Sequence, residues 1–146
     1  MTLVADILKT KAERSVHSIG PAATVFDAVQ TMAQKNIGAL LVIDAGHVIG
    51  IVTERDYARK VVLLERSSRT TPVRDIMSSP VMFVPPQRTS DECMALMTDN
   101  RLRHLPVMDG GQLVGLVSIG DLVKDIISAQ QFVIEQLEHY ISGQPR

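Results

Sequence analysis

The sequence predicts an α/β fold of the α+β kind, in which two copies of one βαββα element pack around a pseudo-twofold axis. Two observations support it: the second half of the chain repeats the first without a gap, and both halves alternate strand and helix patterns in the same order. Residues 16–62 align with residues 81–127 at a constant offset of 65 residues. Eleven of the aligned pairs are identical, whereas chance pairing would give about three. Because one copy alone would make only a small core, we expect the two to complete a single body.

Turn and capping residues mark the first strand and the first helix of each copy. A short β-prone run ends at Gly20-Pro21 in the first copy and at Pro85-Pro86 in the second. Thr24 and Thr89 then stand where a helix N-cap belongs, and each has an acidic residue three positions later. We therefore expect a helix after each threonine, with its apolar stripe facing the core.

A hairpin and a closing helix complete each copy. Apolar runs short enough for buried strands end in turns rich in Asp and Gly, and a second strand follows each turn. These strands are expected at residues 39–43 and 48–52 in the first copy, and at 104–108 and 113–117 in the second. The closing helices are expected to begin near Glu54 and Ile119.

The chain is expected to divide into four segments. They are a first repeat with an N-terminal helix, a polar linker with a helix-stopping proline, a second repeat and a C-terminal helical extension, at residues 1–65, 66–72, 73–128 and 129–146. The extension carries apolar residues that are mostly three or four positions apart, namely Phe132, Val133, Leu137, Tyr140 and Ile141. Such a stripe predicts a docking surface.

Composition and charge exclude several classes of protein. The formal net charge of −1 argues against a nucleic-acid binder, which would carry a strong basic excess. Cys93 is the only cysteine, so an intrachain disulfide framework is excluded and a reducing cytoplasm fits best. No apolar stretch approaches the roughly 20 residues of a spanning helix, so no membrane segment is expected.

The candidate site lies where the second hairpin strand meets the closing helix. In both copies a hydroxyl, Thr53 or Ser118, precedes an aspartate by three positions, Asp56 or Asp121. A carboxylate in the first helical turn can accept hydrogen bonds from a diol, while free backbone N–H groups beside it face an anion. The same spacing also describes a plain capping box with no ligand, and a single copy does not decide between the two.

The repeat and its motifs resemble the CBS-domain pair, also called a Bateman module. The resemblance rests on His-Leu-Pro-Val at residues 104–107 with Asp109 and Gly111, and on Val114 through Asp121, together with the matching scaffold of the first copy. In that family the cleft between the repeats commonly binds adenine nucleotides. The resemblance therefore implies AMP, ATP or NAD(H) as a regulatory ligand, with no cofactor required.

The resemblance also assigns roles to residues of the candidate site. Asp56 and Asp121 would hold ribose hydroxyls, while Thr53 and Ser118 would reach the phosphate or the ribose. Adenine would lie against the apolar strand starts, near Ile19 and Val84 and beside Pro106 and Val107.

The two copies differ where a phosphate would be bound. In the AMP-sensing γ subunit of the energy-stress kinase, basic residues at positions matching Arg103, His104 and Arg55 contact phosphates. The resemblance therefore implies that the phosphate of the ligand at Asp56 meets Arg103 and His104, and that the phosphate of the ligand at Asp121 meets Arg55. An exposed arginine could equally be a solvated surface group, and His104 could be an edge residue of its strand.

The first copy departs from the family pattern on its first hairpin strand. Leu41 replaces the proline found at Pro106, and Gly38-Ala39 stands where the second copy has Arg103-His104. Conversely, Gly120 stands where the first copy has Arg55. The two sites should therefore differ in how they bind an anion.

Enzymatic motifs are absent from the sequence. The four histidines lack zinc-ligand spacing, and no Gly-x-Ser-x-Gly or Walker-type loop occurs. We therefore expect a non-catalytic regulatory module that forms a homodimer and reports ligand occupancy through that dimer or to a separate regulated protein. The alternative is a purely structural interaction module that has no ligand and uses its C-terminal amphipathic helix.

Overall fold

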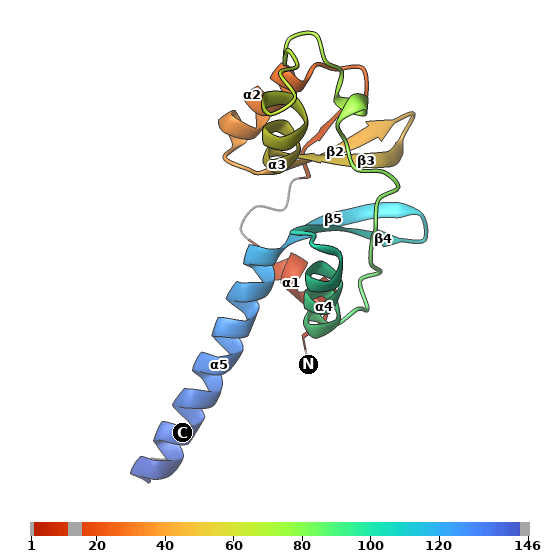
Figure 1. Ribbon diagram of the computed structural model, residues 1–146. Coiled ribbons are helices and arrows are strands. Elements are labelled where there is room, and N and C mark those ends of the chain that lie inside the picture. Colours follow the sequence, from red (N-terminus) through yellow and green to blue (C-terminus); the bar gives the residue numbers. More distant parts are fainter. Residues whose placement is uncertain (1, 12–15, 144–146) are drawn as a thin grey trace. The chain divides into compact units, whose positions relative to one another are not determined.

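Figure 1 shows the computed structural model, which describes residues 2–11 and 16–143. The described residues form two compact units. The first-repeat unit holds residues 16–82, and the second-repeat unit holds residues 2–11 together with residues 83–143. Each unit contains one of the two predicted repeats, and the mixed α+β fold class is confirmed.

The first-repeat unit contains a three-stranded sheet with the order β1-β2-β3. β1 pairs parallel to β2, and β2 pairs antiparallel to β3 as the predicted hairpin. The elements in chain order are β1 (Ser18–Ile19), α2 (Val25–Lys35), β2 (Ala39–Asp44), β3 (His47–Thr53), α3 (Glu54–Tyr57), a π-helical turn η1 (Ala58–Val62) and a 3-10 turn η2 (Val73–Asp75).

The second-repeat unit repeats this order around a two-stranded antiparallel sheet. Its first strand is reduced to a single parallel bridge between Val84 and Val107. The elements are α1 (Val4–Thr10), α4 (Ser90–Asn100), β4 (His104–Asp109), β5 (Gln112–Ser118) and α5 (Ile119–Ser142). None of the helices in the described ranges is both long enough and apolar enough to cross a membrane.

The predicted capping threonines start the helices that cover the sheets. Thr24 caps α2 by accepting the Asp27 N–H at 3.1 Å, and Thr89 caps α4 by accepting the Glu92 N–H at 3.2 Å. Behind these caps, apolar side chains of helix and sheet form one core per unit. Fully buried members are Val25, Ala28, Leu40, Val42, Val52 and Ile76 in the first-repeat unit, and Val4, Cys93, Leu105, Val107, Val117 and Leu122 in the second.

Each unit is completed by the segment that precedes the other repeat. α1 packs in the second-repeat unit, where the Val4 N–H donates to the Arg88 carbonyl at 2.8 Å and Leu3 bridges Thr89. The segment around η2 packs correspondingly in the first-repeat unit, where the Val73 N–H donates to the Ala23 carbonyl at 2.8 Å. The predicted boundaries follow the sequence repeat and therefore place α1 with the first copy. In the structure, Val4 and Ile7 of α1 are buried in the core of the second-repeat unit.

Two glycines at equivalent positions make room for these segments. A Cβ on Gly115 would lie 2.9 Å from Leu8 Cδ2 of α1, and a Cβ on Gly50 would lie 2.5 Å from Met77 Sδ. Because both glycines lack a Cβ, a neighbouring segment can pack closely against the hairpin at each position. Close packing thus explains why both copies have glycine at this position.

Candidate functional site

Each unit has a strand-to-helix corner with the same local geometry. Thr53 ends β3 and caps α3, and Ser118 ends β5 and caps α5. Both residues have extended backbone conformations, which turn the chain from the strand into the helix. Three residues later, Asp56 and Asp121 fold back onto the cap, so the predicted capping box forms in both copies.

In the first-repeat unit the corner is closed by a buried carboxylate. Asp56 Oδ2 accepts the Thr53 N–H at 2.9 Å and the Thr53 hydroxyl at 3.1 Å. Asp56 Oδ1 forms an ion pair with Lys60 Nζ at 3.2 Å, and the same ammonium donates to the Ile76 carbonyl at 2.9 Å. Arg55 is exposed beside this corner. Lys60 therefore links the carboxylate to the segment that precedes the second repeat.

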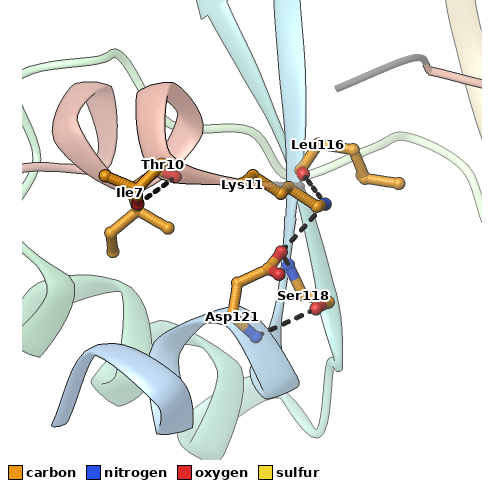
Figure 2. A network of polar contacts seen from close by, with 6 residues as sticks. All are labelled: Ile7, Thr10, Lys11, Leu116, Ser118 and Asp121. Carbon is orange, nitrogen blue, oxygen red and sulfur yellow. Dashed lines mark hydrogen bonds and ion pairs between the residues drawn. The ribbon is translucent and has the colours of Figure 1, made fainter. Parts of the chain in front are cut away.

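In the second-repeat unit the corner has the same design but a different lysine (Figure 2). Asp121 Oδ2 accepts the Ser118 N–H at 2.8 Å, and the Asp121 N–H donates to Ser118 Oγ at 3.1 Å. Lys11 Nζ lies 2.9 Å from Asp121 Oδ2 and donates to the Leu116 carbonyl at 2.8 Å. Lys11 directly follows α1, so the segment preceding the first repeat supplies a cation to the corner of the second.

Strand pairing brings two further basic residues to the second corner. His104 begins β4 and pairs with Ser118, the last residue of β5. The carbonyl of Arg103 accepts the N–H of Ile119 at 2.8 Å, which fixes the backbone of Arg103 at the start of α5 while its side chain is exposed. Arg103 and His104 therefore lie at the same corner as Asp121.

The pKa values at this corner follow from burial and from Lys11. Burial alone would raise the pKa of Asp121, but the Ser118 N–H and the Lys11 ammonium outweigh it, and the pKa lies below its ordinary value. Burial lowers the pKa of His104, and the charges of Lys11 and Arg103 lower it further against the opposing effect of Asp121. His104 is therefore neutral and Asp121 ionised at pH 7.

The residues predicted to contact adenine lie deeper than that role suggests. Val84 and Val107 are 1% and 0% exposed in the second-repeat core, and Pro106 is buried, with its carbonyl accepting the Val84 N–H at 3.0 Å. Ile19 is half-buried and packs against the core of the first-repeat unit. The two valines therefore leave almost no surface for a ligand in this conformation, whereas Ile19 keeps an accessible part.

Lys11 and Lys60 are the site residues that sequence reasoning missed. Lys60 could have been found, because a lysine four residues after an aspartate on a helical segment can form an ion pair with it. Lys11 left no local signal, since it reaches Asp121 only through the packing of α1 in the second-repeat unit.

The described part of the chain contains few other side chains that could bind a metal or act as a nucleophile. No group of three or more His, Cys, Asp or Glu side chains there could hold a metal ion. Burial and, to a smaller extent, the Glu92 carboxylate raise the pKa of the Cys93 thiol, which keeps it protonated. The two corners are therefore the best candidates for a functional site.

Comparison with known proteins agrees with the repeat. The family profile of the CBS domain matches residues 4–63 and 73–128. The chain belongs to the CBS-domain family. The mitochondrial CBS domain-containing protein CBSX3 of Arabidopsis thaliana is 39% identical over 150 residues, which cover 97% of this chain and 73% of that protein.

Solved structures of CBS-domain proteins have the same fold. A protein with CBS domains from Burkholderia ambifaria shares 57% sequence identity at a TM-score of 0.86, and the match covers 88% of this chain and 96% of that one. A hexameric CBS-CP12 protein from bloom-forming cyanobacteria shares 30% identity at a TM-score of 0.75, covering 84% of this chain and 70% of that one. The chain therefore contains two CBS domains in tandem.

Proposed function

We propose that this tandem CBS-domain chain is a non-catalytic regulatory module that binds an adenine nucleotide, AMP, ATP or NAD(H), at its strand-to-helix corners. The observation that carries the proposal is the second corner, where the carboxylate of Asp121 lies at the start of α5 with Lys11 and His104 close by. A nucleoside phosphate needs acceptors for its ribose diol and donors or positive charge for its phosphate. This corner offers both within one unit.

The acceptor part of the corner is Asp121 with Ser118. A carboxylate has about four lone-pair sites, and the Ser118 N–H and Lys11 both contact Oδ2, with a further hydrogen bond from the Ser118 side chain. The lowered pKa keeps this carboxylate ionised, so it can only accept hydrogen bonds, which suits two ribose hydroxyl donors.

The cationic part is Lys11, Arg103 and the start of α5. A lysine ammonium has three donors, and those of Lys11 are directed to Leu116 and Asp121 with one remaining. α5 is a 24-residue helix, and its dipole adds positive potential at its N-terminus, where the Ile119 and Asp121 N–H groups already have partners. A phosphate at this point would be stabilised by the Lys11 ammonium and by the helix dipole.

The first corner offers a related but weaker set of acceptors and positive charges. Asp56 is 9% exposed and Lys60 supplies the cation, whereas Gly38-Ala39 replaces the Arg-His pair of the second copy. We expect the copies to bind with unequal affinity. The assignment of Arg103 and His104 to the phosphate at Asp56, and of Arg55 to that at Asp121, joins residues of two units and stays a prediction.

We further propose that the chain acts as a homodimer in the cytoplasm and reports occupancy through that dimer or to a separate regulated protein. The hexameric CBS-CP12 protein shows that a CBS-domain relative self-associates. A ligand can shift the equilibrium between two arrangements only by its differential affinity for them, so the readout must follow occupancy of the corners.

Isothermal titration calorimetry with AMP, ATP, NAD(H) and S-adenosylmethionine tests the nucleotide proposal. We expect heat of binding with at least one of the adenine nucleotides, and a loss of affinity of at least about 30-fold in Asp121→Ala. The matched control is Glu92→Ala, because Glu92 closes the same kind of capping box on Thr89 in the same unit. No heat with any of the nucleotides, or an equal loss in the control, would contradict the proposal.

A further inference from the structure

The C-terminal helix carries a long apolar seam that its own unit leaves exposed. α5 runs for 24 residues, about 36 Å, and extends well beyond α1 and α4, as Figure 1 shows. Within the described part of the chain, the buried residue of α5 is Leu122, which lies in its first turn. The α5 seam consists of residues spaced alternately four and three apart, namely Val123, Ile127, Gln130, Ile134, Leu137 and Ile141.

The spacing of the seam is that of a coiled coil. Alternating steps of four and three residues place side chains along one line of a helix that pairs with another helix. The five apolar members are 42 to 81% exposed. Five exposed branched side chains along a line of this length, interrupted only by Gln130, indicate a helix partner rather than solvent.

We propose that the partner is the α5 helix of a second copy of this chain, packed antiparallel along the α5 seam. The seam is complementary to itself when reversed, because Val123 then faces Ile141 of the second copy and Ile127 faces Leu137. Gln130, the one polar member of the seam, then faces Ile134 near the centre.

Charges beside the seam fix the antiparallel direction. Lys124 follows Val123 and Glu138 follows Leu137, so both lie on the same flank of the seam, and both are exposed. In the antiparallel register each Lys124 faces Glu138 of the other copy, which gives two ion pairs. A parallel pair would set Glu138 beside Val133 instead, with no ion pair.

This inference rests on the proposed self-association and is independent of nucleotide binding. Sedimentation equilibrium of the full chain from about 1 to about 100 µM tests it. We expect a reversible dimer whose dissociation constant rises at least about 30-fold in Leu137→Asp. Calorimetry on the same variant should still detect nucleotide binding, because Leu137 lies far along α5 from the corner.

Charge-exchange variants test the direction of pairing. Lys124→Glu and Glu138→Lys should each weaken the dimer about tenfold, and the double exchange should restore it to within about twofold. The control is Glu135→Lys, which makes the same charge change on the face of α5 away from the seam and should leave the dimer unchanged.

Three results would overturn the inference. A monomeric wild-type chain at about 100 µM would remove the self-association and this surface together, while leaving nucleotide binding intact. A dimer unaffected by Leu137→Asp would place the contact elsewhere. Single exchanges that weaken the dimer without rescue by the double exchange would exclude the antiparallel register.

Discussion

At the scale of single residues, Lys11 is what sets the second corner apart from an ordinary helix cap. The exposed Thr89–Glu92 capping box has an arginine ion pair on the surface, Arg88 with Glu92 at 2.6 Å. By contrast, the side chains of Lys11 and Asp121 are only 23% and 14% exposed, and Lys11 also donates to the Leu116 carbonyl. A cap alone does not need a shielded cation, whereas an anion site does.

Removing the Lys11 ammonium should destabilise the second-repeat unit in a pH-dependent way. The lowered pKa of Asp121 means that its stabilising effect is present above the ordinary pKa of an aspartate and is lost as pH falls through the folded value. Lys11→Met should cost about 2 kcal/mol at pH 7 and should reduce this acid sensitivity.

Urea unfolding between pH 7 and pH 3 measures both effects. Lys35→Met on the surface of α2 is the control for loss of a lysine, because Lys35 is exposed. Equal stability of Lys11→Met and the wild type at all pH values would show that the Lys11–Asp121 contact contributes nothing.

The protonation of His104 should couple to both stability and ligand binding. Because its pKa is lowered in the folded chain, its contribution to stability is complete above the ordinary histidine value near 6.5 and is lost as pH falls below it. A bound phosphate should raise the His104 pKa, so nucleotide affinity should increase as pH falls from about 7.5 to about 6.

Nuclear magnetic resonance titration of the His104 ring, with and without nucleotide, measures this shift. In His104→Gln the increase in affinity towards low pH should disappear. If the His104 pKa does not move when nucleotide binds, His104 does not contact the phosphate.

At the scale of elements, the exchange of segments between repeats depends on two glycines. Gly50→Ala should cost more stability than Gly115→Ala, about 2 against about 1 kcal/mol. A Cβ at Gly50 would meet Met77 and, at 3.1 Å, the Ser78 carbonyl oxygen, which is held by the Ile51 N–H. A Cβ at Gly115 would meet only the flexible end of Leu8.

Thermal and chemical unfolding of the two alanine variants compares these costs, and Leu8→Ala should offset most of the loss in Gly115→Ala. A larger loss in Gly115→Ala than in Gly50→Ala would mean that α1 is held more rigidly than the segment around η2.

The sequence predicted the elements well because their signals are local. Thr24, Thr53, Thr89 and Ser118 cap helices where capping spacing placed them. The packing of α1 in the second-repeat unit was not predictable from such signals, because hydrophobic periodicity shows which face of a helix is buried but not against which core. Lys11 was missed for the same reason, whereas Lys60 lies only four residues from Asp56.

At the scale of the whole molecule, the duplication gives two corners of one design with different surroundings. The lysine of each corner lies in a different part of the chain. Lys60 lies in the turn after α3, and Lys11 lies in the segment that precedes the first repeat. Only the second copy adds Arg103 and His104. Two CBS domains in one chain therefore need not bind a nucleotide equally, and the second corner is the one we expect to bind the anion more strongly.

We propose that the aspartates of the two corners, Asp56 and Asp121, accept the ribose hydroxyls of an adenine nucleotide. The most direct measurement is calorimetric comparison of AMP with 2′,3′-dideoxy-AMP on the wild type and on Asp56→Ala/Asp121→Ala. We predict that loss of the diol weakens binding to the wild type at least about tenfold and has no further effect on the double variant. Equal affinity of the wild type for AMP and for its dideoxy form would contradict the account.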